Sequence, residues 1–193
     1  MPRIDSKKFY TSAIEMHGTS SKGVNWASKE NQLLRFDAIL ELLPKELSSY
    51  SVSDAGCGFG DFYTYMHKKK RSPKKYIGID SLLDMYSIAS ENTGCEIINA
   101  DICKDNLPSA DYYICSGALN VLTKFETHQF IQNCYNASKH GFIFNALHGD
   151  RESETYNYLT THEIEEIAKD LNVHEISFRD GYLKDDITVG FFR

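Results

Sequence analysis

The feature that most constrains the fold of this chain is a loop with three alternating glycines, Asp-Ala-Gly-Cys-Gly-Phe-Gly-Asp, at residues 54–61. A short apolar segment at 52–55 precedes the loop, and a helical pattern over 61–70 follows it. Alternating glycines let the backbone turn tightly and let a ligand lie directly against the main chain. The sequence therefore predicts an α/β fold with a ligand site between its first strand and the next helix.

Three further segments have the pattern of a strand that ends in polar or small residues. The segment Tyr76–Asp80 ends in an acid about twenty residues beyond the glycines, a spacing that suits a carboxylate binding two ribose hydroxyls. The alternative is that this acid and Ser81 only begin the next helix. The segment Cys95–Ile102 is again strand-like and contains an acid, and Asp111–Asn120 runs from a buried type of strand into a turn of small residues.

In this order, the four segments resemble the motifs of the class I S-adenosylmethionine-dependent methyltransferases. The resemblance implies a Rossmann-like, doubly wound α/β sheet of about seven strands, with the last pair antiparallel. It implies S-adenosyl-L-methionine as the cofactor and S-adenosyl-L-homocysteine as its product. In the family, the residues matching Asp101 and Ile102 hold the adenine, and the turn at Ser116 and Gly117 lies beside the methyl donor.

The spacing of the glycines favours this methyl donor over a dinucleotide. A dinucleotide loop has the pattern G-x-G-x-x-G and binds a pyrophosphate at the helix N-terminus. Here Gly60 comes one residue early and Asp61 follows it, and a carboxylate repels a pyrophosphate. The ammonium and sulfonium of S-adenosylmethionine are favoured by both Asp54 and Asp61, although Asp61 also suits a helix cap. A nicotinamide-dependent oxidoreductase is therefore the disfavoured enzyme alternative.

The segment before the domain, 23–36, contains the only tryptophan, Trp26, and then Gln32 and Arg35 on one helix face. It resembles a subset of small, mostly uncharacterised bacterial methyltransferases, which carry these residue types here and a Ser-Gly-x-x-Asn turn after the fourth strand. We expect the segment Gly18–Arg35 to be a lid, in which Trp26 shields the sulfonium and Arg35 pairs with the donor carboxylate. The alternative is that Trp26 packs on the domain and Arg35 makes a surface ion pair.

The predicted cofactor-binding residues come from the lid and from all four motifs. They are Trp26, Arg35, Asp54, Gly56, Cys57, Gly58, Gly60, Asp61, Asp80, Ser81, Asp101, Ile102, Ser116 and Gly117.

The methyl acceptor is expected at the carboxyl ends of the fourth and fifth strands, because ligands of open α/β sheets bind there. The polar residues at these ends are Ser116, Asn120, Asn145 and His148, and we take the last three as catalytic candidates. Only His148 is able to act as a general base near neutral pH. The alternatives are that His148 is a surface residue and that the asparagines tie down loop backbone.

Composition narrows the classes of partner. The 193 residues are 41% hydrophobic, which suits one domain spanning 1–193, with an N-terminal extension at 1–44 and a core at 50–193. The net charge is −6, and the basic run at 67–75 is interpreted as a solvated helix end. The turn after the fourth strand lacks the Pro-Pro-Tyr or Pro-Pro-Phe pattern of enzymes that methylate amino groups of bases. A nucleic-acid partner is therefore disfavoured.

No apolar stretch approaches the ~18 residues of a membrane span, and the polar start differs from a signal peptide. The five cysteines lack C-x-x-C spacing and the seven histidines lack metal-ligand spacing, so reduced thiols, no metal and a cytoplasmic location are expected. We expect a methyltransferase acting on a small molecule or a limited protein site, as a monomer or homodimer. A non-catalytic regulatory module that only binds S-adenosylmethionine stays open as an alternative.

The periodicity predicts the positions of the regular elements. Helices are expected near 31–43, 61–70, 82–91, 126–138 and 161–170, and strands near 52–55, 76–80, 96–100, 112–116, 141–147, 174–179 and 186–192. The stretch 149–160 is expected to be a loop, and a capping box starting at Thr161 is expected to open the last helix.

Overall fold

The computed structural model describes residues 11–12, 15–16, 18 and 28–193. The strands are β1 (Ser51–Ala55), β2 (Lys75–Asp80), β3 (Glu96–Asn99), β4 (Ala110–Cys115), β5 (Ser138–His148), β6 (Tyr158–Leu159), β7 (Glu175–Arg179) and β8 (Asp186–Phe192). The helices are α2 (Lys29–Leu42), α3 (Asp61–Lys68), α4 (Leu83–Thr93), the 3-10 helix η2 (Ala118–Val121), α5 (Lys124–Ala137) and α6 (Thr161–Asp170).

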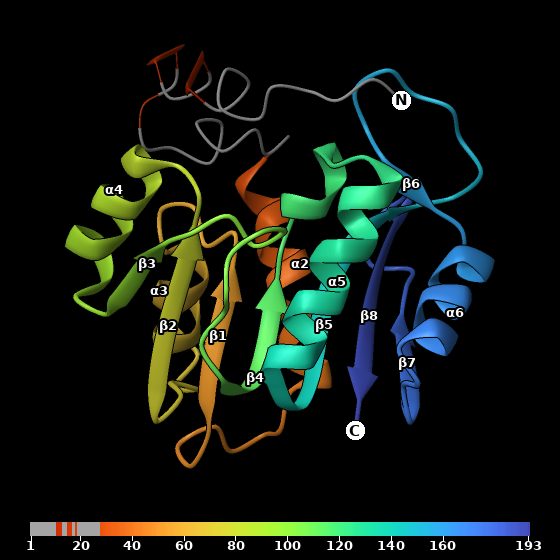
Figure 1. The fold of residues 1–193 in the computed structure, drawn as a ribbon. Coiled ribbons are helices and arrows are strands. Elements are labelled where there is room, and N and C mark those ends of the chain that lie inside the picture. The colour runs from red at the N-terminus through yellow and green to blue at the C-terminus, as the bar shows by residue number, and fades with distance from the viewer. Residues whose placement is uncertain (1–10, 13–14, 17, 19–27) are drawn as a thin grey trace.

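The strands form one sheet of eight strands in the order β3-β2-β1-β4-β5-β8-β7, with β6 paired to β5 (Figure 1). The strands β1 to β5 are parallel to one another, while β8 runs antiparallel to both β5 and β7. The predicted Rossmann-like sheet with an antiparallel last pair is confirmed. The two-residue strand β6 was not expected, because it lies in a polar stretch without periodicity.

Helices cover both faces of the sheet, and alternate strand residues point to opposite faces. Tyr113 and Phe142 point into the core that α5 and α6 close, whereas the neighbouring Ile114 and Ile143 point into the core closed by α2 and α3. Figure 1 shows α5 in front of the sheet and α2 and α3 behind it. Parallel strands buried on both faces explain the nearly continuous apolar segments in the sequence.

Local sequence explains where α5 and α6 begin. Thr123 and Thr160 each open a capping box. In each box the threonine hydroxyl accepts from the backbone N–H of a glutamate three residues on, and the side chain of that glutamate accepts from the backbone N–H of the threonine. The prediction that Thr161 caps α6 is wrong by one residue, because the glutamate that completes the box is Glu163.

The basic run at 67–75 makes contacts within the molecule. Lys69 pairs with Asp37, and Lys75 pairs with Glu96. Arg71 donates to the carbonyl oxygens of residues 40, 43 and 44 and so satisfies the C-terminal end of α2.

Most of the predicted lid, including Trp26, lies outside the described residues, which resume at residue 28. Ser28 caps α2 by accepting from the N–H of Asn31. Within the described part of the chain, no helix is long and apolar enough to cross a membrane.

Candidate functional site

A cavity of about 180 Å³ lies at the carboxyl ends of β1, β2 and β4, the upper end of the sheet in Figure 1. All four sequence motifs contribute to its wall. The predicted cofactor-binding residues that line it are Arg35, Asp54, Gly56, Cys57, Gly58, Asp61, Asp80, Ser81, Asp101, Ile102, Ser116 and Gly117. The structure therefore brings together residues that are up to 82 positions apart in sequence, from Arg35 to Gly117.

Asp80 joins the glycine loop to the end of β2. One carboxylate oxygen accepts from the backbone N–H of Gly58 at 3.0 Å, and the other accepts from the N–H of Leu82, also at 3.0 Å. Asp80 therefore supports the start of α4 and also lines the cavity, while its binding of the ribose hydroxyls stays a prediction. Burial raises the pKa of Asp80 to about 6, although the backbone N–H groups oppose this rise.

Asp54 is a second buried carboxylate on the cavity wall. The hydroxyl of Tyr76 donates to it at 2.6 Å. Burial raises the pKa of Asp54 to about 7, and the charge of Asp80 adds to the rise. Two carboxylates beside one cavity favour a ligand with positive charge, and the ammonium and sulfonium of S-adenosylmethionine meet this condition.

The glycines of the loop have different roles. The N–H groups of Gly56 and Cys57 donate to the carbonyl oxygen of Ile79, which fixes the loop against β2. Gly60 does not line the cavity, so its predicted contact with the cofactor is not supported by its position. It adopts a left-handed φ of 79°, and a Cβ there would collide with Thr93 of α4. Gly60 thus allows α3 to start close to α4.

Asp61 connects α3 to α2 beside the cavity. Its carboxylate accepts from Lys29 Nζ at 3.2 Å and from Gln32 Nε2 at 3.0 Å. The alternative that it caps α3 is wrong, since Gly60 occupies the cap position and makes no side-chain bond there. Gln32 also lines the cavity. The sequence had indicated this residue, because its spacing from Arg35 places both side chains on one helix face.

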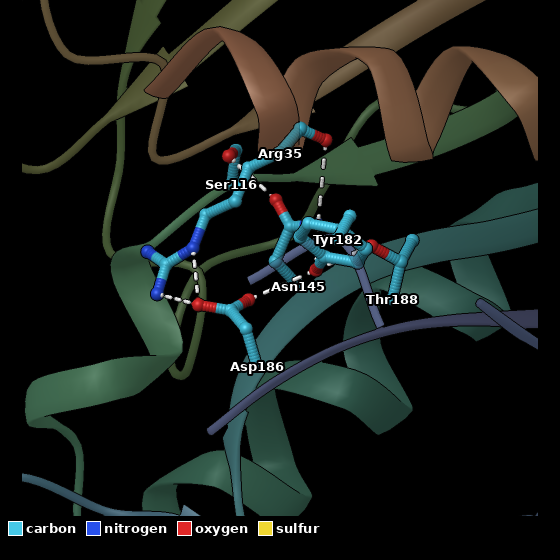
Figure 2. Close-up of polar contacts among 6 residues, drawn as sticks. All are labelled: Arg35, Ser116, Asn145, Tyr182, Asp186 and Thr188. Carbon is cyan, nitrogen blue, oxygen red and sulfur yellow. Dashed lines mark hydrogen bonds and ion pairs between the residues drawn. The ribbon is translucent and has the colours of Figure 1, made fainter. Parts of the chain in front are cut away.

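Arg35 forms a buried ion pair with Asp186, the first residue of β8 (Figure 2). Its Nε lies 2.7 Å from Asp186 Oδ2, and its Nη2 binds the same oxygen. The alternative of a surface ion pair is wrong, because the two side chains are only 9% and 3% exposed. Arg35 also lines the cavity, and its pairing with the donor carboxylate stays a prediction.

The three predicted catalytic residues occupy different places. Asn120 lines the cavity. Asn145 is fully buried behind the wall and accepts from the Ser116 hydroxyl at 2.6 Å (Figure 2). His148 is absent from the wall, and its Nε2 lies 3.1 Å from Thr161 Oγ1. Along β5 its side chain shares a face with Ala146, which packs in the core closed by α5 and α6, and the imidazole contacts the first residue of α6.

Several apolar residues of the wall were missed by the sequence analysis. The wall includes Phe36 and Met85, which carry only the periodicity of core residues, and this pattern does not separate a cavity wall from a core. It also includes Phe59, which lies between two glycines of the loop. Tyr156, which is 41% exposed, lies in the aperiodic stretch before β6 and carried no signal.

Comparison with known proteins shows which fold the chain shares. Residues 52–141 match the family model described as a methyltransferase domain. Magnesium protoporphyrin IX methyltransferase from Synechocystis PCC 6803, solved with bound SAH, is 13% identical, with a TM-score of 0.75 over 97% of this chain and 98% of that chain. Human N-acetylserotonin methyltransferase in complex with SAM is 14% identical, with a TM-score of 0.67 over 98% of this chain and 60% of that chain. No curated protein matches the sequence.

The sheet order, the antiparallel last pair and the glycine loop facing the cavity define the class I S-adenosylmethionine-dependent methyltransferase fold. Residues 52–141, which match the methyltransferase-domain model, contain all four sequence motifs. The two solved neighbours hold SAH and SAM, respectively.

Proposed function

We propose that this protein transfers a methyl group from S-adenosylmethionine to a small molecule. The observation that carries the proposal is the single cavity wall that holds both the four cofactor motifs and the polar side chains of Ser116 and Asn120. The names of two structural neighbours, magnesium protoporphyrin IX methyltransferase and N-acetylserotonin methyltransferase, state small-molecule substrates for those proteins. A cavity, and not an open basic surface, suits an acceptor of the same size class.

The chain's own residues would bind and orient the two reactants. Asp80 would accept hydrogen bonds from the ribose hydroxyls, and Asp101 with Ile102 would contact the adenine. Gly56 and Gly58, which have no side chains, would let the donor lie against the loop. Bound S-adenosylmethionine supplies a methyl group on a positively charged sulfur. Methyl transfer is an in-line displacement, so holding the acceptor in line within a cavity shielded from water is the main contribution expected of the protein.

Binding of S-adenosylhomocysteine, measured by titration calorimetry, tests the first half of the proposal. We expect binding of this compound and none of NAD, because the carboxylate of Asp61 at the start of α3 would repel a pyrophosphate. The variant Asp80→Ala should bind S-adenosylhomocysteine more weakly by tenfold or more, since charged hydrogen bonds contribute ~1.5–3 kcal/mol each. Binding of NAD without any response to S-adenosylhomocysteine would contradict the proposal.

Turnover tests the second half. Incubation of the protein with S-adenosylmethionine and a panel of small hydroxyl- and amine-bearing compounds should release S-adenosylhomocysteine. The variant Asp80→Ala serves as the matched control for background hydrolysis. Cofactor binding without turnover on any member of a broad panel would favour the regulatory module that only binds the cofactor.

A further inference from the structure

The strand β7 forms one open edge of the sheet, on the right in Figure 1. Its five residues pair with β8, and no other strand of the described residues pairs with them. An edge strand presents a row of backbone N–H and C=O groups with which a further strand is able to pair. The sequence of β7, Glu-Ile-Ser-Phe-Arg, contains neither the lysine nor the proline by which many edge strands prevent such pairing.

One face of β7 carries apolar surface that the molecule leaves uncovered. Phe178 is 40% exposed, although its neighbour on β8, Val189, is fully buried in the core that α5 and α6 close. Ile176 lies on the same face of the strand and packs against that core. The helix α6 therefore does not cover this face as far as the outermost strand, and an added strand would bury Phe178.

The opposite face of β7 carries two charges of opposite sign. Glu175 is exposed and forms no ion pair within the part of the chain that the structure describes. Arg179 donates from Nε to Glu41 Oε2 of α2 at 2.6 Å and from Nη1 to the carbonyl oxygen of Asp180. Its Nη2 makes no hydrogen bond among the described residues. β7 thus offers an acid at its start and a further donor at its end.

The sequence of β7 is complementary to itself when two copies run antiparallel. If Ser177 lies opposite Ser177 of a second copy, Glu175 lies opposite Arg179, and Ile176 lies opposite Phe178. Opposite charges then meet on one face and apolar side chains meet on the other, and both kinds of cross-strand pair are stabilising. If the pairing is centred on Ile176 or Phe178 instead, Ser177 lies opposite a charged residue and the charge pairs are lost.

The other edge of the sheet lacks this property. The strand β3 has four residues, and its one charged residue, Glu96, already pairs with Lys75 of β2 at 2.7 Å. An antiparallel pair of β3 strands has no cation to place opposite Glu96. Of the two edge strands, β7 is therefore the one that fits a second copy of itself.

We propose that two copies of this chain associate through β7, which pairs antiparallel with its counterpart across a two-fold axis at Ser177. The two sheets join into one, in an association that does not depend on the proposed activity. Glu175 of each copy binds Arg179 of the other, while Arg179 keeps its contact with Glu41. Main-chain hydrogen bonds hold the strands together and the side chains set their register. Because a five-residue pairing is small, the dimer should be weak and dependent on concentration.

Charge reversal tests the register. Sedimentation of the wild-type chain should show a dimer that increases with concentration up to about 0.5 mM. Glu175→Arg places two cations opposite each other, Arg179→Glu places two acids opposite each other, and each variant alone should stay monomeric. An equimolar mixture of the two variants should dimerise again, because every charge then meets its opposite. Glu91→Arg, an exposed change on α4, is the matched control and should leave the dimer unchanged.

A cross-link tests the axis and traps a weak dimer. Directly opposite residues of an antiparallel pair have Cα atoms ~4.5–5.5 Å apart, a separation that a disulfide spans. Under mild oxidation, Ser177→Cys should therefore form a covalent dimer on a non-reducing gel, and adding Glu175→Arg should suppress it. Ser87→Cys, exposed on α4, and the wild-type chain are the controls and should not cross-link.

Thermal melting of each variant separates lost folding from lost association. A wild-type chain that stays monomeric, together with a Ser177→Cys variant that does not cross-link, would overturn the proposal. A dimer that persists in Glu175→Arg would also overturn it, because that dimer must use another surface. Recovery of the dimer in the mixture of the two charge variants is the result that only the antiparallel register centred on Ser177 predicts.

Discussion

At the scale of single residues, Asp54 and Asp80 carry charge where burial opposes it. Their pKa values in the folded protein are about 7 and about 6, above the ordinary value of 3.8. Between the unfolded and folded pKa values, the folded state binds more protons than the unfolded state. The free energy of unfolding contributed by these groups is therefore full below about pH 4 and is lost as the pH rises through 6 and 7. Such a cost is expected at a site kept for a charged ligand.

The variant Asp54→Asn should remove this cost and keep an acceptor for the Tyr76 hydroxyl. Urea unfolding at pH 8 should show a free energy of unfolding higher than wild type by on the order of a few kcal/mol. The gain should shrink at pH 5, where the wild-type carboxyl is protonated in the folded state. Affinity for S-adenosylmethionine should fall, because the variant lacks the negative charge. Asp84→Asn, an exposed change on α4, is the control for a lost charge, and equal stability of Asp54→Asn and wild type at pH 8 would refute the argument.

At the scale of elements, α6 depends on its first turn. The Thr160 hydroxyl accepts from the N–H of Glu163 at 3.2 Å, and Glu163 Oε2 accepts from the N–H of Thr160 at 2.8 Å. Lys124 of α5 also reaches Glu163, at 2.6 Å. The capping box thus sets the start of α6 and links it to the neighbouring helix.

Thr160→Ala should lower the free energy of unfolding by about 1 kcal/mol, the usual cost of losing a threonine cap. Chemical denaturation measures this change. Thr161→Ala, one residue later, is the matched control and should cost less, since the Thr161 hydroxyl contacts the His148 ring at 3.1 Å and takes no part in the capping box. A larger loss from Thr161→Ala than from Thr160→Ala would show that the box does not govern the helix start.

At the scale of the whole molecule, the Arg35–Asp186 pair joins α2 to β8 across 151 residues of sequence. Removing one partner leaves a buried charge without its counterion, so Arg35→Met and Asp186→Leu should each cost about 3–5 kcal/mol. The double variant should recover much of that loss, because two apolar side chains replace the pair. Urea unfolding of all four proteins gives the coupling energy. Additive losses in the double variant would mean that the two side chains stabilise the fold independently.

Much of the site was already determined by local sequence. The loop at 54–61 has glycine at the positions where φ is positive, so its conformation could be predicted directly from the sequence. Asp80 ends β2, Ser116 directly follows β4, and Asp101 lies two residues beyond the end of β3. Parallel strands bring such positions to one edge of the sheet. Periodicity placed the helices and strands to within a few residues for the same reason, because burial on one or two faces repeats along the chain.

Only the tertiary structure decided what the polar residues outside these motifs do. From the sequence, Arg35 could either contact the ligand or form a surface ion pair. In the structure, Arg35 is buried in an ion pair with Asp186. Asp186 lies 151 residues further along the chain and reaches Arg35 only because the antiparallel strand β8 places it there. Side chains alternate between the two faces of β5, so His148 lies on the face toward α6 and Asn145 lies on the opposite face, beside Thr188. The face of each residue is set by the strand register and not by the residue type. The sequence by itself located the cavity at the carboxyl ends of the parallel strands, because each motif follows or ends a strand. The direction of each hydrogen bond in the cavity wall required the packing of segments distant in sequence, because only that packing brings their donors and acceptors together.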